Sequence, residues 1–483
     1  MPTARNPHSR PRRQLSRRGF IGSTAGAAAC ALWPFSAGAP EAQAAAARLR
    51  DDYVGRLCYN ENPLGPSPLA VSAMSDELAR GHRYADWFAE SLRNDLATLH
   101  GVARSQIRAG CGATEMLRLC AYALADPDGN VVCPYPSYGG FGGDAAFMGA
   151  EVRHSDLDGD YRVDLDRILA LVDANTSAVC ITNPNNPTGP VLGDAEIAAF
   201  VAALPPQVAV VIDEAYHEYV HDTAYRSAIE LVRQDANVVV LRTFSKAFGL
   251  AGVRIGYLVG HPDLVNLITP WQIWGTVSRP ALVAARAALT DAQHVSDTVA
   301  LNDQTKQYCY DQLDLMGLEY IPSETNFFMV DVGQNAGPVA SDLASRGVMV
   351  RTGWGMGQHL RVSTGTQAEM ETFISELQDI LSAMRAGGTA PATQTALFGN
   401  FPNPVRDQTS IRFALQAPDR VRLEVFDVRG RLVRRLLDEP CGRGYFDIGW
   451  DRRDGRGRQV PGGTYFYRFR AGAQSATRRM ILL

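Results

Sequence analysis

The sequence predicts an α/β fold with a mostly parallel sheet covered by helices on both faces, followed by a separate all-β sandwich. Between about residues 90 and 260, short apolar runs alternate with segments of helical period. These runs are apolar almost throughout, as expected of strands that are buried on both faces. After residue 397 the pattern changes to short alternating strands separated by turn residues. A chain of 483 residues is long enough for two to four such units.

Composition narrows the class of protein. With 46% hydrophobic and 20% charged residues, the chain resembles a soluble globular protein. Its net charge of -4 gives no indication of a nucleic-acid partner. The eight cysteines show no C-x-x-C or metal-ligand spacing, so we interpret them as small buried residues. Outside the N-terminus no apolar run approaches the ~20 residues of a membrane span, so no stable span is expected after cleavage.

The first 47 residues are predicted to be a signal peptide. Arg17 and Arg18 end a basic segment, a Gly/Ala-rich apolar stretch covers 20–35, and small residues at 37–39 or 41–45 suit cleavage. The S-R-R-x-F-I core resembles a twin-arginine signal. Lipoprotein cleavage before Cys30 is an alternative, and a disordered basic tail would leave the apolar stretch unexplained. We therefore expect an exported protein, periplasmic or at the cell surface or secreted.

The central elements are expected in a regular order. Ligands of such sheets bind at the carboxyl ends of the strands, where polar motifs occur in this sequence. The expected strands are 130–133 (ended by Pro134), 177–182, 208–212 and 238–241, and the expected helices are 113–124, 195–203, 281–289 and 369–384.

Lys246 is the residue around which the other motifs are arranged. Lysine occurs only twice in the chain, at Lys246 and Lys306, and arginine supplies the remaining positive charge. Arginine stays charged and cannot form a Schiff base, so a lysine after the 238–241 strand suggests the need for a deprotonatable amine. An isolated lysine in this position would otherwise be interpreted as a solvated loop residue.

Three further motifs follow strands or open helices. Gly112 precedes a helix start where the N–H groups of Ala113 and Thr114 could hold a phosphate, although this signal is weak alone. Tyr138 follows a strand and could either stack on a flat ring or pack in its loop. Asn186 lies in the loop N-P-N-N-P-T-G-P, whose prolines and glycine would hold its amide rigidly.

Asp213 stands directly at the end of an apolar strand. A carboxylate in that place would be poorly solvated without a cationic partner, and a protonated pyridine nitrogen is such a partner. Tyr216, three residues on, can point to the same spot. Together these motifs are what pyridoxal 5'-phosphate (PLP) requires.

Residues 50–385 resemble the fold-type I PLP-dependent aminotransferases of class I/II, most closely the histidinol-phosphate aminotransferases. The resemblance implies a PLP-transferase large domain with an α+β small domain. The strings that carry it are Asn60–Pro68, Arg83-Tyr84, Gly112–Glu115, Asn183–Gly189, Asp213–Tyr216, Thr243–Arg254, Glu324–Phe327 and Leu360–Ser363.

The resemblance also implies roles in cofactor chemistry. Lys246 would hold the cofactor covalently and then move the proton of the substrate, and Asp213 would keep the ring nitrogen protonated. Tyr216 and Asn186 would bind the ring hydroxyl, and Tyr138 would stack on the ring. The phosphate would be held by the amides of Ala113 and Thr114, by Thr243, Ser245 and Arg254, and by Tyr84 reaching over from the neighbouring subunit of a homodimer.

Substrate contacts follow the same resemblance. Arg361 would bind the acidic group of the substrate, with Asn326 and Asn60 in the same pocket, and Arg351 would join it where that group is a phosphate. The alternative for both arginines is a surface position. The N-terminal arm of the family is short in this chain, and Tyr53 is a candidate replacement for its tyrosine. The implied substrates are an amino acid (or histidinol phosphate) and a 2-oxo acid.

Two other functions remain open at this stage. The first keeps the cofactor but catalyses decarboxylation, as in the threonine-phosphate decarboxylase relatives. The second is a surface binding or structural protein that carries a degenerate enzyme domain.

The predicted division of the chain has four parts. After the signal peptide (1–47) comes an aminotransferase domain at 48–386, with a large part at about 81–278 and a small part formed by 48–80 and 279–386. A linker at 387–397 leads to the sandwich at 398–483. The strings F-P-N-P, V-F-D-V-R-G-R-L-V and V-P-G-G-T-Y-F-Y resemble FlgD-like immunoglobulin domains and type IX secretion sorting domains. This implies an outer-membrane sorting system as a partner, and the alternative is a sandwich that only stabilises the protein.

Overall fold

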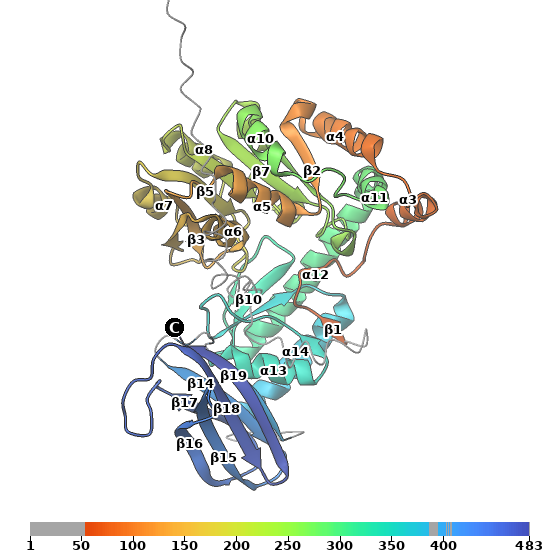
Figure 1. Cartoon of the computed structure of the whole chain (residues 1–483). Coiled ribbons are helices and arrows are strands. Elements are labelled where there is room, and N and C mark those ends of the chain that lie inside the picture. The colour runs from red at the N-terminus through yellow and green to blue at the C-terminus, as the bar shows by residue number, and fades with distance from the viewer. Residues whose placement is uncertain (1–53, 386–394, 402, 404, 406–407, 483) are drawn as a thin grey trace, which may run out of the picture.

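The computed structural model describes residues 54–385, 395–401, 403, 405 and 408–482. The predicted signal peptide and Tyr53 lie outside these residues, as does most of the predicted linker. Figure 1 shows an α/β part that contains the largest sheet, a second part below it, and the C-terminal β-sheets beside the second part.

The largest sheet has seven strands in the order β2-β8-β7-β6-β5-β3-β4. The five strands from β7 to β4 run parallel, whereas β8 runs antiparallel to both β7 and β2. This confirms the mostly parallel sheet. The strands are β2 (Ile107–Gly110), β3 (Asn130–Tyr135), β4 (Glu151–Asp156), β5 (Thr176–Thr182), β6 (Ala209–Asp213), β7 (Val238–Thr243) and β8 (Gly256–Gly260).

Strand β3 corrects one expectation. It was expected to end before Pro134, but it continues to Tyr135 and pairs there with β4. Its pairing with β5 ends at Val132, so at Pro134 the strand pairs only with β4. A proline, which has no N–H to donate, is tolerated in such a position.

Helices cover both faces of this sheet because alternate strand residues point to opposite sides. In β6, Val210 and Ile212 pack into one apolar cluster while Ala209 and Val211 pack into another. The first cluster holds residues of α3 (Pro68–Leu78), α4 (Asp86–His100), α7 (Leu165–Leu171), α8 (Asp194–Ala203), α9 (Ile229–Arg233) and α11 (Arg279–Thr290), and the second holds residues of α5 (Ala113–Leu124), α6 (Gly140–Met148) and α10 (Pro262–Ile268).

The second part is smaller and mixed. Its cluster of buried residues includes Leu57 near the start of the described chain and side chains of three helices. Ala70 of α3 and Ala281 of α11 belong instead to the cluster of the large sheet, which favours a boundary after α11 rather than at 278. The elements are β1 (Gly55–Arg56), α12 (Ala292–Met316), β9 (Tyr320–Ile321), β10 (Phe327–Asp331), α13 (Ala336–Ser345), β11 (Val348–Met349), β12 (His359–Ser363) and α14 (Gln367–Arg385).

The C-terminal residues form two antiparallel sheets that share one apolar core, as expected of a sandwich. Trp450 and Phe469 are among its buried residues. The expected hairpin turn closes where Asp427 N donates to Arg431 O at 3.0 Å. The sheets are β13-β14-β17 (Ala396–Phe401, Thr409–Leu415, Gly444–Trp450) and β16-β15-β18-β19 (Leu432–Cys441, Asp419–Asp427, Gly463–Ala471, Gln474–Leu482).

The cysteines, possible metal ligands and possible membrane spans can be examined in the described residues. The seven cysteines within the described ranges are all free, and all but Cys111 are buried. In the same ranges no group of side chains could hold a metal ion. No described helix is long and apolar enough to cross a membrane.

Candidate active site

The carboxyl ends of three neighbouring strands place the predicted residues at one edge of the large sheet. Asn186 follows β5, Asp213 ends β6, and Lys246 lies three residues after β7. Since β5, β6 and β7 are adjacent and parallel, the loops that follow them meet at this edge.

Lys246 is a partly buried amine with a weakened hold on its proton. Its Nζ donates to the carbonyl of Tyr59 at 3.0 Å and lies 5.9 Å from the centre of the Tyr216 ring. Burial lowers the pKa of Lys246 to about 8, and the positive charges of Arg361 and Arg254 act in the same direction. An amine of this kind is available as a nucleophile and as a base near neutral pH.

Asp213 is a buried carboxyl without a matching cation. It is 6% exposed, and no ion pair to it is recorded among the described residues. Burial raises its pKa to about 6, although the Ala215 N–H donates to it at 3.2 Å and the charge of Lys246 opposes the rise. A cation brought by a ligand would therefore be bound well at this position.

A chain of hydrogen bonds joins Tyr216 to the predicted substrate residues. The Tyr216 hydroxyl accepts from Asn60 Nδ2 at 2.9 Å and from Asn186 Nδ2 at 3.1 Å. Asn186 Oδ1 in turn accepts from Arg361 Nη1 at 2.7 Å. Burial raises the pKa of Tyr216 to about 12, so its hydroxyl keeps its proton and can donate it.

Arg361 is deeply buried, in contrast to the surface position considered above. It is 2% exposed, its Nη2 donates to Cys58 O at 2.8 Å, and its Nε has no recorded partner. Burial lowers the pKa of Arg361 to about 10, and the nearby charge of Arg351 adds to the effect. Both guanidinium groups lie over the ring of Trp354, at 4.9 Å from Arg361 and 5.2 Å from Arg351. Two cations that face one ring could share an anionic group.

A second polar group lies around the start of α5. This helix begins without a side-chain cap, so its first N–H groups, which have no acceptor inside the helix, can bind a ligand. Gly112 has φ of 81°, and a Cβ there would collide with the guanidinium of Arg254. Arg254 Nη1 lies 3.5 Å from Ser245 Oγ, which accepts from Thr243 Oγ1 at 2.9 Å. The set of donors is that of a phosphate site.

The remaining predicted residues divide into two groups. Tyr138 interacts with the side chain of Thr114 at this phosphate-like site, and the nearby charge of Asp213 contributes to the raised pKa of Tyr138. Asn326 Nδ2 donates to the carbonyl of Asn60 at 3.1 Å and so supports the loop that carries Asn60. Tyr84 has no recorded contact with these residues in the described chain. It is 74% exposed and its ring lies 5.1 Å from that of Trp274.

Three contributors were missed from the sequence. The carbonyls of Cys58 and Tyr59 accept from Arg361 and Lys246, but a carbonyl carries no residue-type signal. Trp354 has φ of 58°, which is uncommon for a bulky residue. Its position between Gly353 and Gly355, shortly after a predicted substrate arginine, was the available signal.

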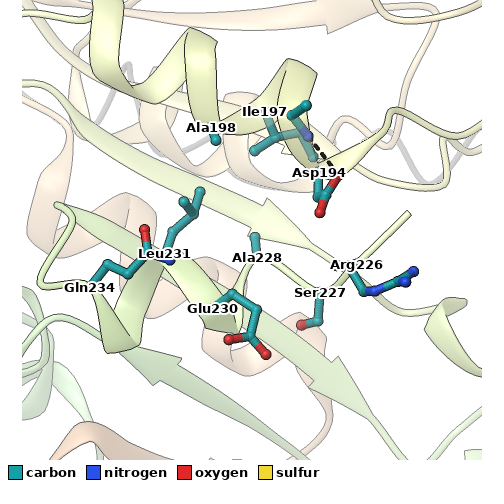
Figure 2. Close-up of a pocket in the computed structure, with 10 residues that line it drawn as sticks. Asp194, Ile197, Ala198, Arg226, Ser227, Ala228, Glu230, Leu231 and Gln234 are labelled. Atoms are coloured by element: carbon teal, nitrogen blue, oxygen red, sulfur yellow. Dashed lines mark hydrogen bonds between the residues drawn. The ribbon is translucent and has the colours of Figure 1, made fainter. Parts of the chain in front are cut away.

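A separate pocket of about 140 Å³ lies between α8 and α9 (Figure 2). None of the predicted site residues lines it, and its polar lining includes Arg226, Ser227 and Glu230. Ser227 donates to Glu214 at 2.7 Å, so this hydroxyl already has a partner.

Two parts of the chain match known protein families. Residues 54–377 match the family model described as aminotransferase class I and II, and residues 400–483 match the one described as secretion system C-terminal sorting domain. A histidinol-phosphate aminotransferase of Moorella thermoacetica is 38% identical over 330 residues, which are 68% of this chain and 85% of that protein. A histidinol-phosphate aminotransferase of Akkermansia muciniphila is 39% identical over 328 residues, covering 68% and 90%.

Solved structures agree with these matches. The histidinol-phosphate aminotransferase of Sinorhizobium meliloti, solved in complex with pyridoxal-5'-phosphate, has a TM-score of 0.65 at 29% identity and covers 69% of this chain and 92% of its own. The L-threonine-O-3-phosphate decarboxylase of Porphyromonas gingivalis has a TM-score of 0.59 at 22% identity, covers 68% and 99%, and shows the fold alone. Since the family model spans 54–377, which includes every strand of the large sheet and Lys246, the chain belongs to the class I and II aminotransferase family.

Proposed function

We propose that this protein is a PLP-dependent aminotransferase of the histidinol-phosphate aminotransferase type, exported from the cytoplasm. It would transfer an amino group between an amino acid, or histidinol phosphate, and a 2-oxo acid. One observation carries the proposal: Lys246 and Asp213 lie at the same edge of the large sheet. The pKa of Lys246 is lowered, and Asp213 has no ion pair among the described residues.

The residues present fit the cofactor. The phosphate-like site at α5 is lined by hydroxyls, N–H groups and Arg254, and the close approach of that arginine requires Gly112 to lack a Cβ. The Asp213 carboxyl matches a protonated ring nitrogen, and Tyr216 with Asn186 offers donors to a ring hydroxyl. When bound, PLP supplies an electron-withdrawing ring that stabilises the charge left on Cα after proton removal.

The proton transfer is assigned to Lys246. Its Nζ, once deprotonated, would take the proton from the substrate Cα and would return it to the carbon of the cofactor that is joined to the substrate nitrogen. The lowered pKa keeps a useful fraction of the amine neutral near pH 7 to 8. Asp213 would supply the negative charge that faces the protonated ring nitrogen, and Tyr138 would stack on the ring.

The substrate pocket is assigned to the residues around Trp354. Arg361 binds the acidic group of the substrate, and the hydrogen bond from its Nη1 to Asn186 fixes its orientation. Arg351, which faces the same ring, joins in binding a phosphate group. Asn60 and Asn326 complete the pocket.

The test is an assay of the purified protein with 2-oxoglutarate and a panel of amino acids that includes histidinol phosphate. Steady formation of glutamate with at least one donor is expected. Lys246→Arg keeps the charge but should lower kcat by about 10²–10⁴-fold through lost proton transfer. Release of CO2 without a keto product would favour the decarboxylase, and no reaction with any compound would remove the proposal.

A homodimer is proposed from the surface near Tyr84. Large apolar residues are exposed there, with Ile273 at 74% and Trp274 at 66%. Such a patch commonly marks a protein contact. In a dimer, Tyr84 would reach the phosphate site in the neighbouring subunit, which explains why it has no site contact in one chain. Sedimentation analysis should give twice the chain mass.

Export is proposed from both ends of the chain. A sorting domain at 400–483 suggests secretion or a cell-surface position, and the twin-arginine signal at 1–47 would bring the folded enzyme across the inner membrane. Replacing Arg17 and Arg18 with lysine should retain the protein in the cytoplasm. Unchanged localisation would remove the twin-arginine assignment. We propose the division into 48–386, 387–397 and 398–483, which the family matches at 54–377 and 400–483 support in outline. Strand β13 begins at Ala396, two residues before the proposed start of the sandwich.

A further inference from the structure

The second lysine of the chain is buried next to the active site. Lys306 lies on α12 and is 8% exposed. No ion pair to it is recorded among the described residues. Its Nζ donates to Ser323 O at 2.7 Å and to Thr325 O at 3.1 Å. A buried ammonium that binds only carbonyls is costly, so its presence here calls for an explanation.

The segment that Lys306 binds leads directly into the substrate pocket. Thr325 precedes Asn326, whose side chain holds the Asn60 carbonyl. The next residue, Phe327, packs edge-on against Tyr216 at 5.1 Å and lies under Arg361 at 5.2 Å. Any shift of residues 323–327 would therefore move the groups that line the pocket.

Lys306 is one of three buried polar residues that α12 presents to this region. Asn302 Nδ2 donates to Thr325 O at 3.3 Å, and its Oδ1 accepts from Thr364 at 2.8 Å. Thr298 accepts from Asn62 Nδ2 at 3.0 Å. The three residues recur every four positions and share one face of the helix, which extends toward β10 in Figure 1. One helix face thus holds three separate pocket segments.

We propose that Lys306 is a positioning residue, which holds residues 323–327 through two carbonyls and thereby sets Asn326 and Phe327 for substrate binding. The inference rests on the proposed aminotransferase function. The shape of the site explains the choice of lysine: a compact ammonium reaches two carbonyls two residues apart, whereas the planar fork of arginine needs more room. Because Lys306 touches the substrate side of the pocket, it should affect substrate binding more than the attachment of PLP.

The experiment compares Lys306→Met with Thr305→Val in the full-length holoenzyme. Met fills a similar volume without donors, so Ser323 O loses the bond that Lys306 supplies. Thr305 is also buried but donates only within its own helix, which makes it a matched control for general damage. KM, kcat, the visible absorption of bound PLP and amide hydrogen exchange at residues 323–327 are measured for both.

Lys306→Met should raise KM by about 10- to 100-fold with a smaller change in kcat. Exchange at residues 323–327 should become faster, while the absorption of PLP stays unchanged. Thr305→Val should leave KM and this exchange at wild-type values. If Lys306→Met fails to fold, Lys306→Gln, which keeps a donor, should fold and show an intermediate rise in KM.

Two results would overturn the inference. One is a wild-type KM in a folded Lys306→Met or Lys306→Gln protein, and the other is an equal KM effect from Thr305→Val. Failure of the proposed function looks different, because the wild-type protein itself would then turn over no donor while the exchange difference could still be measured.

Discussion

Replacing Asp213 with asparagine should stabilise the PLP-free protein at pH 7 while weakening its affinity for PLP. The folded chain raises the pKa of Asp213 from 3.8 to about 6. A raised pKa means that the favourable contribution of this group is complete below about pH 3.8 and is lost as the pH rises through 6. Above pH 6 the ionised carboxyl therefore destabilises the fold.

The difference between the two pKa values corresponds to about 3 kcal/mol. The asparagine side chain carries no charge, so the Asp213→Asn protein should avoid this penalty and melt on the order of 5 °C higher at pH 7.5. The advantage should shrink toward pH 5, where the wild-type carboxyl is protonated. Thermal unfolding of both PLP-free proteins at several pH values measures it.

The control is Asp173→Asn, for which the opposite sign is expected. Asp173 accepts from Asn130 at 2.9 Å and from Arg153 at 2.8 Å, and these hydrogen bonds hold the pKa of its carboxyl well below its usual range. Removing that charge should therefore destabilise the protein at pH 7.5.

The cofactor supplies a second comparison. PLP should raise the melting temperature of the wild-type protein more than that of Asp213→Asn. The protonated ring nitrogen offsets the cost of the buried Asp213 carboxylate, and the asparagine variant has no such charge to offset. An Asp213→Asn protein with wild-type stability at every pH would refute the idea that Asp213 awaits a cation.

Other predictions test separate parts of the site. Gly112→Ala should weaken PLP binding by roughly 1–2 kcal/mol, about tenfold in Kd by fluorescence titration, because its Cβ meets Arg254; unaltered affinity would argue against the phosphate site. Mixing the inactive variants Tyr84→Ala and Lys246→Ala should restore about one quarter of wild-type activity, since half of the dimers are hybrids with one intact site of two; no recovery would place Tyr84 outside the neighbouring site. Arg361→Gln should raise the KM of the amino donor by at least about 30-fold, which corresponds to about 2 kcal/mol, whereas a rise of less than twofold would place the binding site of the acidic group elsewhere.

The sequence predicted the elements whose signal is local. Buried strands such as β6 and β7 are apolar throughout, and the polar residue that ends such a strand marks the ligand edge. Asp213 was found by this rule and Lys246 as a rare lysine that follows such a strand, before any family resemblance was considered. The family resemblance then supplied the roles of Arg361 and Asn326, which no local pattern assigns.

Features that depend on distant contacts could not be predicted. Pro134 was expected to end β3. The strand continues because it still pairs with β4, and the sequence does not show which strands pair. The roles of the Tyr59 carbonyl and of Trp354 arise only when the second part of the chain packs over the lysine edge. Lys306 was noticed only as a rare lysine, since its carbonyl partners lie 17 and 19 residues further on.

The most direct test of the central claim is the visible absorption spectrum of the purified protein before and after addition of amino donors. A band from PLP joined to Lys246 is expected, and at least one donor should convert this band to that of the amine form of the cofactor. In Lys246→Arg the band should be absent at equal PLP concentration. A wild-type protein that shows no such band with added PLP, or an unchanged band in Lys246→Arg, would contradict the account.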